Sequence, residues 1–215
     1  PASQKVYSEL EDEPGALERA EEILRAGGVV AFPTDTVYGI GVDARRPDAV
    51  TELYIIKQRA PDKAIPLLVA DLEDARPFVA EVPRAAQALI DAFWPGGLTL
   101  ILPIAPGVPA ALSPGPGIAV RKPDHPTPLE LIRRLGAPLA VTSANISGSA
   151  ESLTAQEVLA QLGRRVDLIL DGGRTPGTRA STVVDLTTRP ARLLRVGPIP
   201  PEQIRAYLPD VVTDS

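Results

Sequence analysis

Four polar segments of the chain carry the types of side chain that bind phosphates and carboxylates. They are Pro33–Gly39, Lys57–Lys63, Thr142–Gly148 and Asp171–Thr182. Each lies where a predicted strand or helix ends, and open α/β sheets gather their ligands at the ends of strands. Each segment alone is weak evidence for a site, and their combination is the stronger signal.

The first two segments offer hydroxyl groups and positive charges. In the first, two threonines flank Asp35, a set that can hydrogen-bond a small polar ligand. The alternative is an ordinary Thr/Asp turn, which is the commoner use of such residues. In the second, Lys57, Arg59 and Lys63 place three cations within seven residues, which suits phosphates. The alternative is a helix end that favours cations through its dipole, which explains Lys57 better than Lys63.

The other two segments combine hydroxyl or amide groups with glycine. Ser143 and Asn145 directly follow a predicted strand, where they can bind a nucleotide through side chains and backbone N–H groups. A plain Ser/Asn turn explains them equally well. The loop 172–180 is glycine-rich and carries two arginines, so we predict that it is a movable cover over phosphates. No segment matches the Walker P-loop or the dinucleotide fingerprint.

Composition excludes several classes of protein. The chain has no cysteine and one histidine, His125, which removes disulfides, thiolate metal sites and cysteine nucleophiles and leaves little basis for a zinc site or a Ser-His-Asp triad. A net charge of −5 argues against a broad nucleic-acid-binding surface. Prolines interrupt the least polar stretch, residues 96–112, so it cannot span a membrane as a helix. We expect a cytoplasmic protein without membrane contact.

The elements that must position these segments alternate between helix and strand. We predict helices at residues 14–25, 48–58, 71–79, 84–93, 127–135, 154–162 and 202–207, and strands at 29–32, 65–70, 98–102, 118–121, 139–142, 167–170, 182–185 and 192–196. Capping boxes are predicted at Thr127 and Thr154. Because strict alternation breaks twice, we expect a single α/β domain over residues 1–215, with a mixed, twisted open sheet between two helix layers.

In this order and spacing, the segments strongly resemble the YrdC-like threonylcarbamoyl-AMP synthase family, in its short single-domain form. The motifs that carry the resemblance are Pro33–Gly39, Lys57-x-Arg59, Phe93–Thr99, Val120–His125, Ser143-x-Asn145, Ser181–Asp185 and Leu194–Gly197. They run from about residue 15 to 200. The combined pattern is far more specific than any one motif.

The resemblance implies an activity and a set of roles. The family is a nucleotidyltransferase that converts L-threonine, bicarbonate and ATP into threonylcarbamoyl-AMP and pyrophosphate, for tRNA modification. It implies threonine contacts from Thr36, Arg121 and Ser181. It implies ATP contacts from Lys57, Arg59, Lys63, Ser143, Asn145 and Arg195, with Lys57 and Arg59 stabilising charge during the reaction. Mg²⁺ would be carried mainly by the ATP phosphates, with no dedicated metal site.

The resemblance also leaves open points. Ala64 stands where the family often has proline, Leu68 where some members have histidine, and Gly117 where some have threonine, so substrate contacts at the last two positions are in doubt. His125 is expected to be a solvated loop residue. A downstream threonylcarbamoyl-transferring enzyme complex is the expected partner, with tRNA bound at most weakly. The alternatives are a non-catalytic RNA-binding module and a carbamoyl-adenylate-forming enzyme of another pathway.

Overall fold

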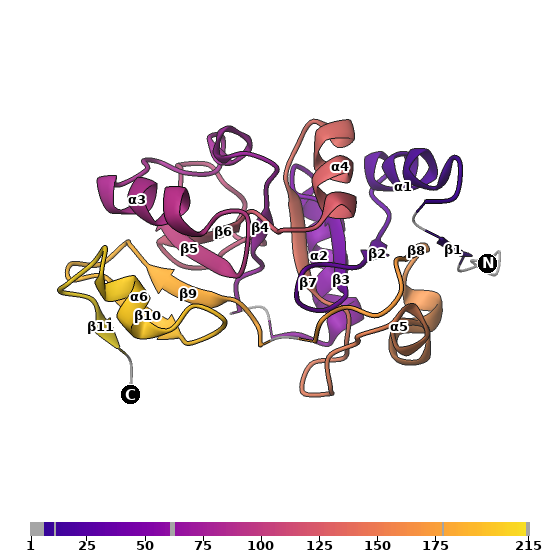
Figure 1. The fold of residues 1–215 in the computed structure, drawn as a ribbon. Coiled ribbons are helices and arrows are strands. Elements are labelled where there is room, and N and C mark those ends of the chain that lie inside the picture. The colour runs from indigo at the N-terminus through magenta and orange to yellow at the C-terminus, as the bar shows by residue number, and fades with distance from the viewer. Residues whose placement is uncertain (1–6, 11, 61–62, 178, 214–215) are drawn as a thin grey trace.

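A mixed β-sheet runs through the whole length of the molecule (Figure 1). The computed structural model describes residues 7–10, 12–60, 63–177 and 179–213. In that part of the chain, eleven strands follow the order β1-β8-β2-β3-β7-β4-β6-β5-β9-β10-β11. Their bounds are β1 Tyr7–Leu10, β2 Val30–Phe32, β3 Gly39–Asp43, β4 Leu67–Leu68, β5 Leu98–Pro103, β6 Gly117–Arg121, β7 Leu139–Ser143, β8 Leu168–Asp171, β9 Thr182–Asp185, β10 Arg192–Arg195 and β11 Val212–Thr213.

The sheet contains both parallel and antiparallel pairs, as we expected of a mixed topology. For example, β4 is parallel to β6 and antiparallel to β7. The helices are α1 Ala16–Arg25, α2 Pro47–Lys57, α3 Arg84–Phe93, α4 Pro126–Leu135, α5 Ala155–Leu162 and α6 Pro201–Arg205, with short 3₁₀ helices at Leu72–Ala75 and Gly163–Arg165.

The period-two alternation of the strands divides the core into two layers. In β2, Val30 and Phe32 pack with α1 and α4, whereas Ala31 faces the opposite layer with α2, α3, α5 and α6. Leu68 belongs to the first layer and Leu67 to the second. Both sheet faces are thus covered by helices, which confirms the expected three-layer architecture.

The face that α1 and α4 cover becomes polar toward β5 and β6. Leu68 lies on this face and pairs in register with Arg121 of β6, so the arginine side chain points the same way. Thr99 of β5 points there too, because its neighbours Leu98 and Leu100 belong to the opposite layer. Polar side chains are therefore buried where the cover of α1 and α4 ends, which prepares a site at that position.

One long connection crosses the molecule between β8 and β9. Since β8 and β9 lie near opposite ends of the strand order, residues 172–181 must pass from one end of the sheet to the other, and Figure 1 shows this segment in orange. We call residues 172–181 the strap. Thr178, inside the predicted cover loop, lies outside the described residues.

Several local predictions were wrong. Gly39–Asp43 forms the central strand β3, which we missed because two glycines lower its apparent strand propensity. The predicted helix 71–79 is only the 3₁₀ turn Leu72–Ala75. It opens with a capping box between Asp71 and Asp74 that we also missed. The short strands β1 and β11 were not predicted.

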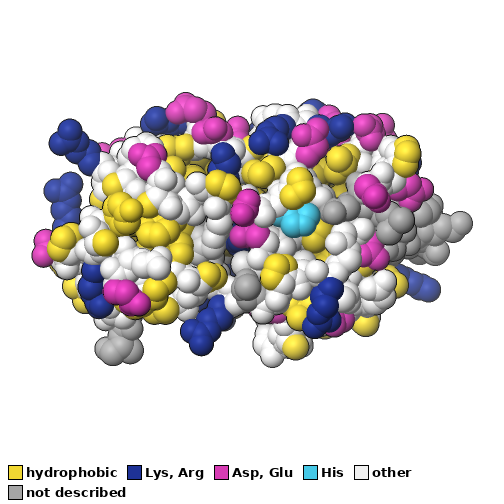
Figure 2. Space-filling view, in the orientation of Figure 1, with side chains coloured by type: hydrophobic (Ala, Val, Ile, Leu, Met, Phe, Trp, Pro, Cys, Tyr) yellow, Lys and Arg dark blue, Asp and Glu magenta, His cyan; other side chains and the backbone are white. Residues whose placement is uncertain are grey.

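The two predicted capping boxes had different outcomes. Thr154 does cap α5, accepting a hydrogen bond from the Glu157 N–H at 3.2 Å, although the Glu157 carboxylate bonds to the N–H of Leu153 instead. The box at Thr127 was wrong. Helix α4 begins at Pro126, and the Nδ1 atom of His125 accepts from the Thr127 N–H at 3.2 Å. His125 is therefore a helix cap and not simply a solvated loop residue, and Figure 2 shows the single histidine at the surface near the middle of the molecule.

Candidate active site

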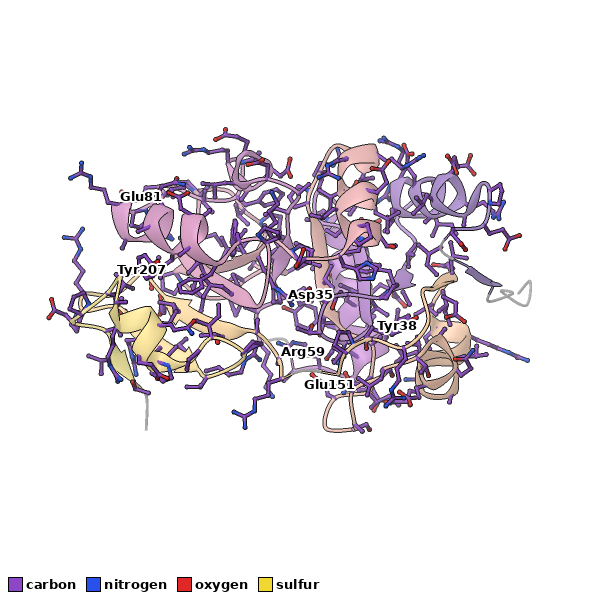
Figure 3. The ribbon with its side chains drawn as sticks, in the orientation of Figure 1. Asp35, Tyr38, Arg59, Glu81, Glu151 and Tyr207 are labelled. Carbon is purple, nitrogen blue, oxygen red and sulfur yellow. The ribbon has the colours of Figure 1, made fainter. Side chains whose placement is uncertain are left out.

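A small cavity of about 190 Å³ lies on the polar part of the sheet face. Its walls come from segments that are far apart in the chain: Thr34, Thr36, Val37, Tyr38, Gly39, Arg59, Pro66, Leu68, Thr99, Arg121, Val141, Thr142, Ser143, Glu151, Ala180, Ser181 and Arg195. Figure 3 shows four labelled residues of this region, Asp35, Tyr38, Arg59 and Glu151, gathered between the two ends of the sheet. All four polar segments contribute to this one cavity, as the strand-end argument predicted.

The guanidinium of Arg121 is fixed inside this cavity by three neighbours. Its Nε donates to the Gly96 carbonyl at 2.9 Å, and one Nη donates to the Asp35 carboxylate at 2.6 Å. The other Nη lies 3.5 Å from the Thr36 hydroxyl. A guanidinium has five N–H donors, so two remain, one on each Nη atom. Arg121 is thus a held, planar fork that still has donors for a carboxylate.

Arg195 is held in a similar way at the rim. Its Nε donates to the Ser181 carbonyl at 2.8 Å, and an Nη donates to the Ser181 hydroxyl at 3.1 Å. The same hydroxyl lies 2.7 Å from that of Thr99. Burial of the guanidinium lowers the pKa of Arg195 from its ordinary value, and the Arg121 charge adds to this, while the Glu151 charge opposes it. Two cations in one small cavity create a site that favours an anion.

The strap contributes Ala180 and Ser181 to the cavity wall, and its earlier residues are hydrogen-bonded to the wall residues Tyr38 and Thr36. The buried Tyr38 hydroxyl donates to the Gly173 carbonyl at 2.7 Å and accepts from the Gly172 N–H at 3.1 Å. Further along, the Gly177 N–H donates to the Thr36 carbonyl at 3.0 Å. In this structure the strap is therefore hydrogen-bonded to wall residues at Gly172, Gly173 and Gly177. Its role as a movable cover stays a prediction.

The far end of the strap is held by close backbone packing. A side chain at Gly197 would meet the Ala180 carbonyl oxygen at 2.2 Å, so only glycine fits there. Its N–H donates to the Thr182 hydroxyl at 2.9 Å. This contact explains why glycine follows Arg195 in the Leu194–Gly197 motif, since it places β10 close enough for Arg195 to reach Ser181.

Lys57 has a different environment from the arginines. It is the last residue of α2 and is buried, with only 3% of its surface exposed. Its ammonium donates to the Ser143 carbonyl at 2.6 Å, to the Ser143 hydroxyl at 2.8 Å and to the Asn145 side-chain oxygen. Burial lowers the pKa of Lys57 to about 8, with the Arg59 charge acting in the same direction and the Glu151 charge against it.

Arg59 and Lys63 complete the second predicted segment. Arg59 lines the cavity and donates to the carbonyls of Ala64 at 2.8 Å and Lys63 at 3.3 Å. Lys63 is exposed and lies outside the cavity wall. The loop between them includes residues 61–62, which are outside the described part, so the side chain of Arg59 is the cation of this loop that reaches the cavity.

The structure sorts the predicted site residues into three groups. Six line the cavity: Thr36, Arg59, Arg121, Ser143, Ser181 and Arg195. Lys57 and Asn145 lie beneath it, bonded to each other and to Ser143. Lys63 stands apart. Of the two doubtful positions, Leu68 lines the cavity, whereas Gly117 does not, and a side chain there would meet Ile101 at 2.4 Å.

Tyr38, Thr99 and Glu151 are wall residues to which the sequence assigned no role. Thr99 and Tyr38 lie within matching motifs, but their functions depend on contacts with Ser181 and the strap that only the fold creates. Glu151 is the one acidic residue among the described lining residues. It lies just beyond the Ser143-x-Asn145 segment, and no pattern marked it.

Outside this cavity, the described residues show no second group of the predicted site residues. A larger hollow of about 910 Å³ lies beside α1, α2 and the 3₁₀ turn Gly163–Arg165, and contains none of the predicted site residues. No described group of three or more His, Asp or Glu side chains is arranged to hold a metal ion. Among the described helices, none has the length and hydropathy needed to cross a membrane.

Comparison with known proteins connects this geometry to a family. Residues 22–197 match the Sua5_yciO_yrdC family, which is described as "Telomere recombination". The chain is 39% identical over 214 residues to a threonylcarbamoyl-AMP synthase of Bacillus subtilis, covering 97% of the chain and 61% of that relative. It is 41% identical over 186 residues to a putative threonylcarbamoyl-AMP synthase of Mycobacterium tuberculosis, covering 86% of the chain and 85% of that relative.

A solved structure agrees with these relatives. The crystal structure of P. abyssi Sua5 complexed with L-threonine superposes with a TM-score of 0.89 at 36% identity. It covers 98% of the present chain and 62% of the Sua5 chain. The chain therefore spans less than two thirds of the B. subtilis and P. abyssi relatives.

Proposed function

The chain belongs to the Sua5_yciO_yrdC family, and from that premise we propose that it is an L-threonylcarbamoyladenylate synthase. It would join L-threonine, bicarbonate and ATP into threonylcarbamoyl-AMP with release of pyrophosphate. One observation carries the proposal. Two arginine forks, Arg121 and Arg195, face one small cavity together with the hydroxyls of Thr36 and Ser181, which suits an amino-acid carboxylate beside a phosphate chain.

We assign the substrates to different walls of this cavity. Threonine would bind through its carboxylate to Arg121 and through hydrogen bonds to Thr36 and Ser181. ATP would lie toward Arg59, Arg195 and Ser143, with Lys63 reaching the phosphates from outside the wall. The family signature adds Lys57 and Asn145 to the nucleotide side, and we assign them there as residues of the site.

The reaction needs positioning more than covalent catalysis. The threonine amine would form a bond to the carbon of CO₂ derived from bicarbonate and lose a proton. An oxygen of the resulting carbamate would then attack the α-phosphorus, and the bond to pyrophosphate would break. The chain would hold the two reactants in contact and stabilise the developing charge with Arg59, Lys57 and Arg195. No nucleophilic side chain is required, consistent with a chain that has no cysteine.

A magnesium ion fits this donor set only if the phosphates hold it. Glu151 is the single carboxylate among the described lining residues, which is too few for a protein cage for Mg²⁺. When bound, the ion would neutralise phosphate charge. Glu151, the one carboxylate among the described lining residues, would be the side chain available to an ion or its water ligands.

The product is unstable, so we propose that it passes to a downstream enzyme complex in the cytoplasm that transfers the threonylcarbamoyl group to tRNA. On the face shown in Figure 2, lysine and arginine side chains are interspersed with aspartate and glutamate. That mixture gives this face no broad basic patch, and the net charge of −5 also argues against a broad tRNA-binding surface. The tRNA would therefore be bound mainly by the partner.

Pyrophosphate release from ATP tests the proposal. It should require both L-threonine and bicarbonate, and Arg195→Met should abolish most of it. Arg192→Met, on the same strand but outside the cavity wall, is the matched control and should retain activity. Release that depends on carbamoyl phosphate instead of threonine would favour a carbamoyl-adenylate enzyme. No release, together with salt-sensitive tRNA binding, would favour an RNA-binding module.

A further inference from the structure

The Lys57 ammonium has as many hydrogen-bond acceptors as it has protons. A lysine ammonium offers three N–H donors and no acceptor. All three are engaged by the Ser143 carbonyl, the Ser143 hydroxyl and the Asn145 side-chain oxygen. Lys57 is also absent from the residues that line the cavity. All three donors of the ammonium are therefore used within the protein, and none is left for a phosphate.

The groups that Lys57 holds form a brace under the nucleotide side of the site. The Ser143 hydroxyl donates to the Asn145 side-chain oxygen at 2.7 Å, and the Asn145 amide donates to the Ser149 carbonyl at 2.7 Å. The Ser147 N–H donates to the Lys57 carbonyl at 3.0 Å. The loop 143–149 is thus fixed to the end of α2 at several points, and Ser143 is the member of this network that lines the cavity.

The backbone separates the two cations of the Lys57-x-Arg59 motif. Gln58 between them has a left-handed conformation, with φ 51° and ψ 43°. This turn ends α2, so that Lys57 points into the protein while Arg59 reaches the cavity wall. Two basic residues only two positions apart therefore have different surroundings.

We propose that Lys57 is a positioning residue, which orients Ser143 and the loop 143–149 toward the nucleotide without touching a phosphate itself. Direct contacts with the phosphates are left to Arg59, Lys63 and Arg195. The proposal rests on the proposed function for the identity of the ligand as ATP. It assigns different roles to the two cations of one sequence motif.

A double-mutant cycle on ATP affinity distinguishes positioning from direct contact. If Lys57 acts through Asn145, Lys57→Met and Asn145→Ala should each weaken ATP binding by about tenfold, and the double variant also by only about tenfold, because both remove the same brace. Losses that multiply to about a hundredfold would overturn the proposal. The matched control is Arg59→Met with Asn145→Ala, whose losses should multiply, because the Arg59 side chain donates to the Lys63 and Ala64 carbonyls of its own loop. Calorimetry measures each affinity.

Nuclear magnetic resonance on the wild-type protein keeps the proposal testable if Lys57→Met fails to fold. The ¹⁵N signal of the Lys57 ammonium should change little when ATP is added, and should show no coupling to phosphorus. A phosphorus coupling would overturn the proposal. In the ligand-free protein, Asn145→Ala should speed exchange of the Lys57 ammonium protons with water, and unchanged exchange would also overturn it. This last measurement needs no nucleotide, so it stands even if the protein binds no ATP and the proposed function fails.

Discussion

Two groups of cations lie within the same site and differ in how their hydrogen bonds are used. On the α2 side, Lys57 donates all its protons to Ser143 and Asn145. On the β6 and β10 side, Arg121 and Arg195 are each anchored by part of their donors and keep others for a ligand. If only their positive charge were considered, the two groups would be expected to have the same role.

The difference shows what the side-chain type contributes. A compact ammonium can be fully satisfied by one loop, whereas a guanidinium has enough donors to be held and still bind a ligand. The arginine side of the site is therefore suited to recognition and the lysine side to support. The following predictions test whether this division is real, from the largest expected effect to the smallest.

Removal of the Arg121 fork should have the largest effect. Arg121→Met should lower kcat/KM for threonine by about 10²–10³-fold, the loss typical of truncating a buried, hydrogen-bonded charge. Arg121→Lys should recover little, because one ammonium cannot serve Gly96, Asp35 and a ligand carboxylate together. Steady-state kinetics with varied threonine, and thermal unfolding as a check of folding, measure this. Near-wild-type activity of Arg121→Lys would show that an ammonium can replace the guanidinium at this position, and the contrast between the arginine and lysine sides would be lost.

Lys57, on the lysine side, should instead change how the free energy of unfolding depends on pH. The pKa of Lys57 falls from 10.5 to about 8 in the folded chain. Between these values the unfolded chain still holds the proton that the folded chain has released. The free energy of unfolding must therefore rise with pH in this window. The rise should reach about 3 kcal/mol by pH 10.5, relative to Lys57→Met.

Urea unfolding of the wild type and Lys57→Met between pH 7 and 10.5 measures this difference. Toward pH 7 the two proteins should approach the same slope, because Lys57 is then mostly protonated in both the folded and the unfolded wild type. Parallel curves over the whole range would show that Lys57 is not desolvated by its surroundings, and the contrast with the arginines would be lost.

The smallest effect should come from Asp35, which holds Arg121 without facing the cavity as a lining residue. Asp35→Asn keeps an oxygen acceptor but removes the ion pair. We expect KM for threonine to rise by about threefold to tenfold with a smaller change in kcat, because Arg121 remains but is less firmly held. Asp48→Asn, which breaks an exposed ion pair with Arg46, is the control and should leave KM unchanged.

Much of the site could be predicted because its parts are short and local. Hydroxyls and cations at strand ends, such as Thr36, Ser143 and Ser181, lie in recognisable motifs, and the order of strands and helices implied an α/β sheet. The division between Lys57 and Arg59 could not be predicted. It depends on the left-handed Gln58 and on acceptors 86 and 88 residues away, neither of which leaves a local pattern.

The errors in the fold have similar causes. Strand β3 is buried on both faces and contains two glycines, so neither alternation nor propensity marked it. Strand β4 has only two residues, although the apolar run around it predicted six. The cap at His125 replaced the predicted box at Thr127, because a histidine ring can accept a backbone hydrogen bond as a threonine hydroxyl does. In each case tertiary contacts decided the outcome.

The strap also determines the order in which the protein can be completed during synthesis. Strand β2 ends at Phe32, but β8, which pairs with it, ends only at Asp171. At translation rates of about 5–20 residues per second, the edge of β2 that pairs with β8 stays without its partner strand for on the order of ten seconds. Strand β5 waits in the same way for β9, on the other side of the strap. Both halves of the sheet therefore leave the ribosome with an open edge, and both are closed by a single late segment of the chain.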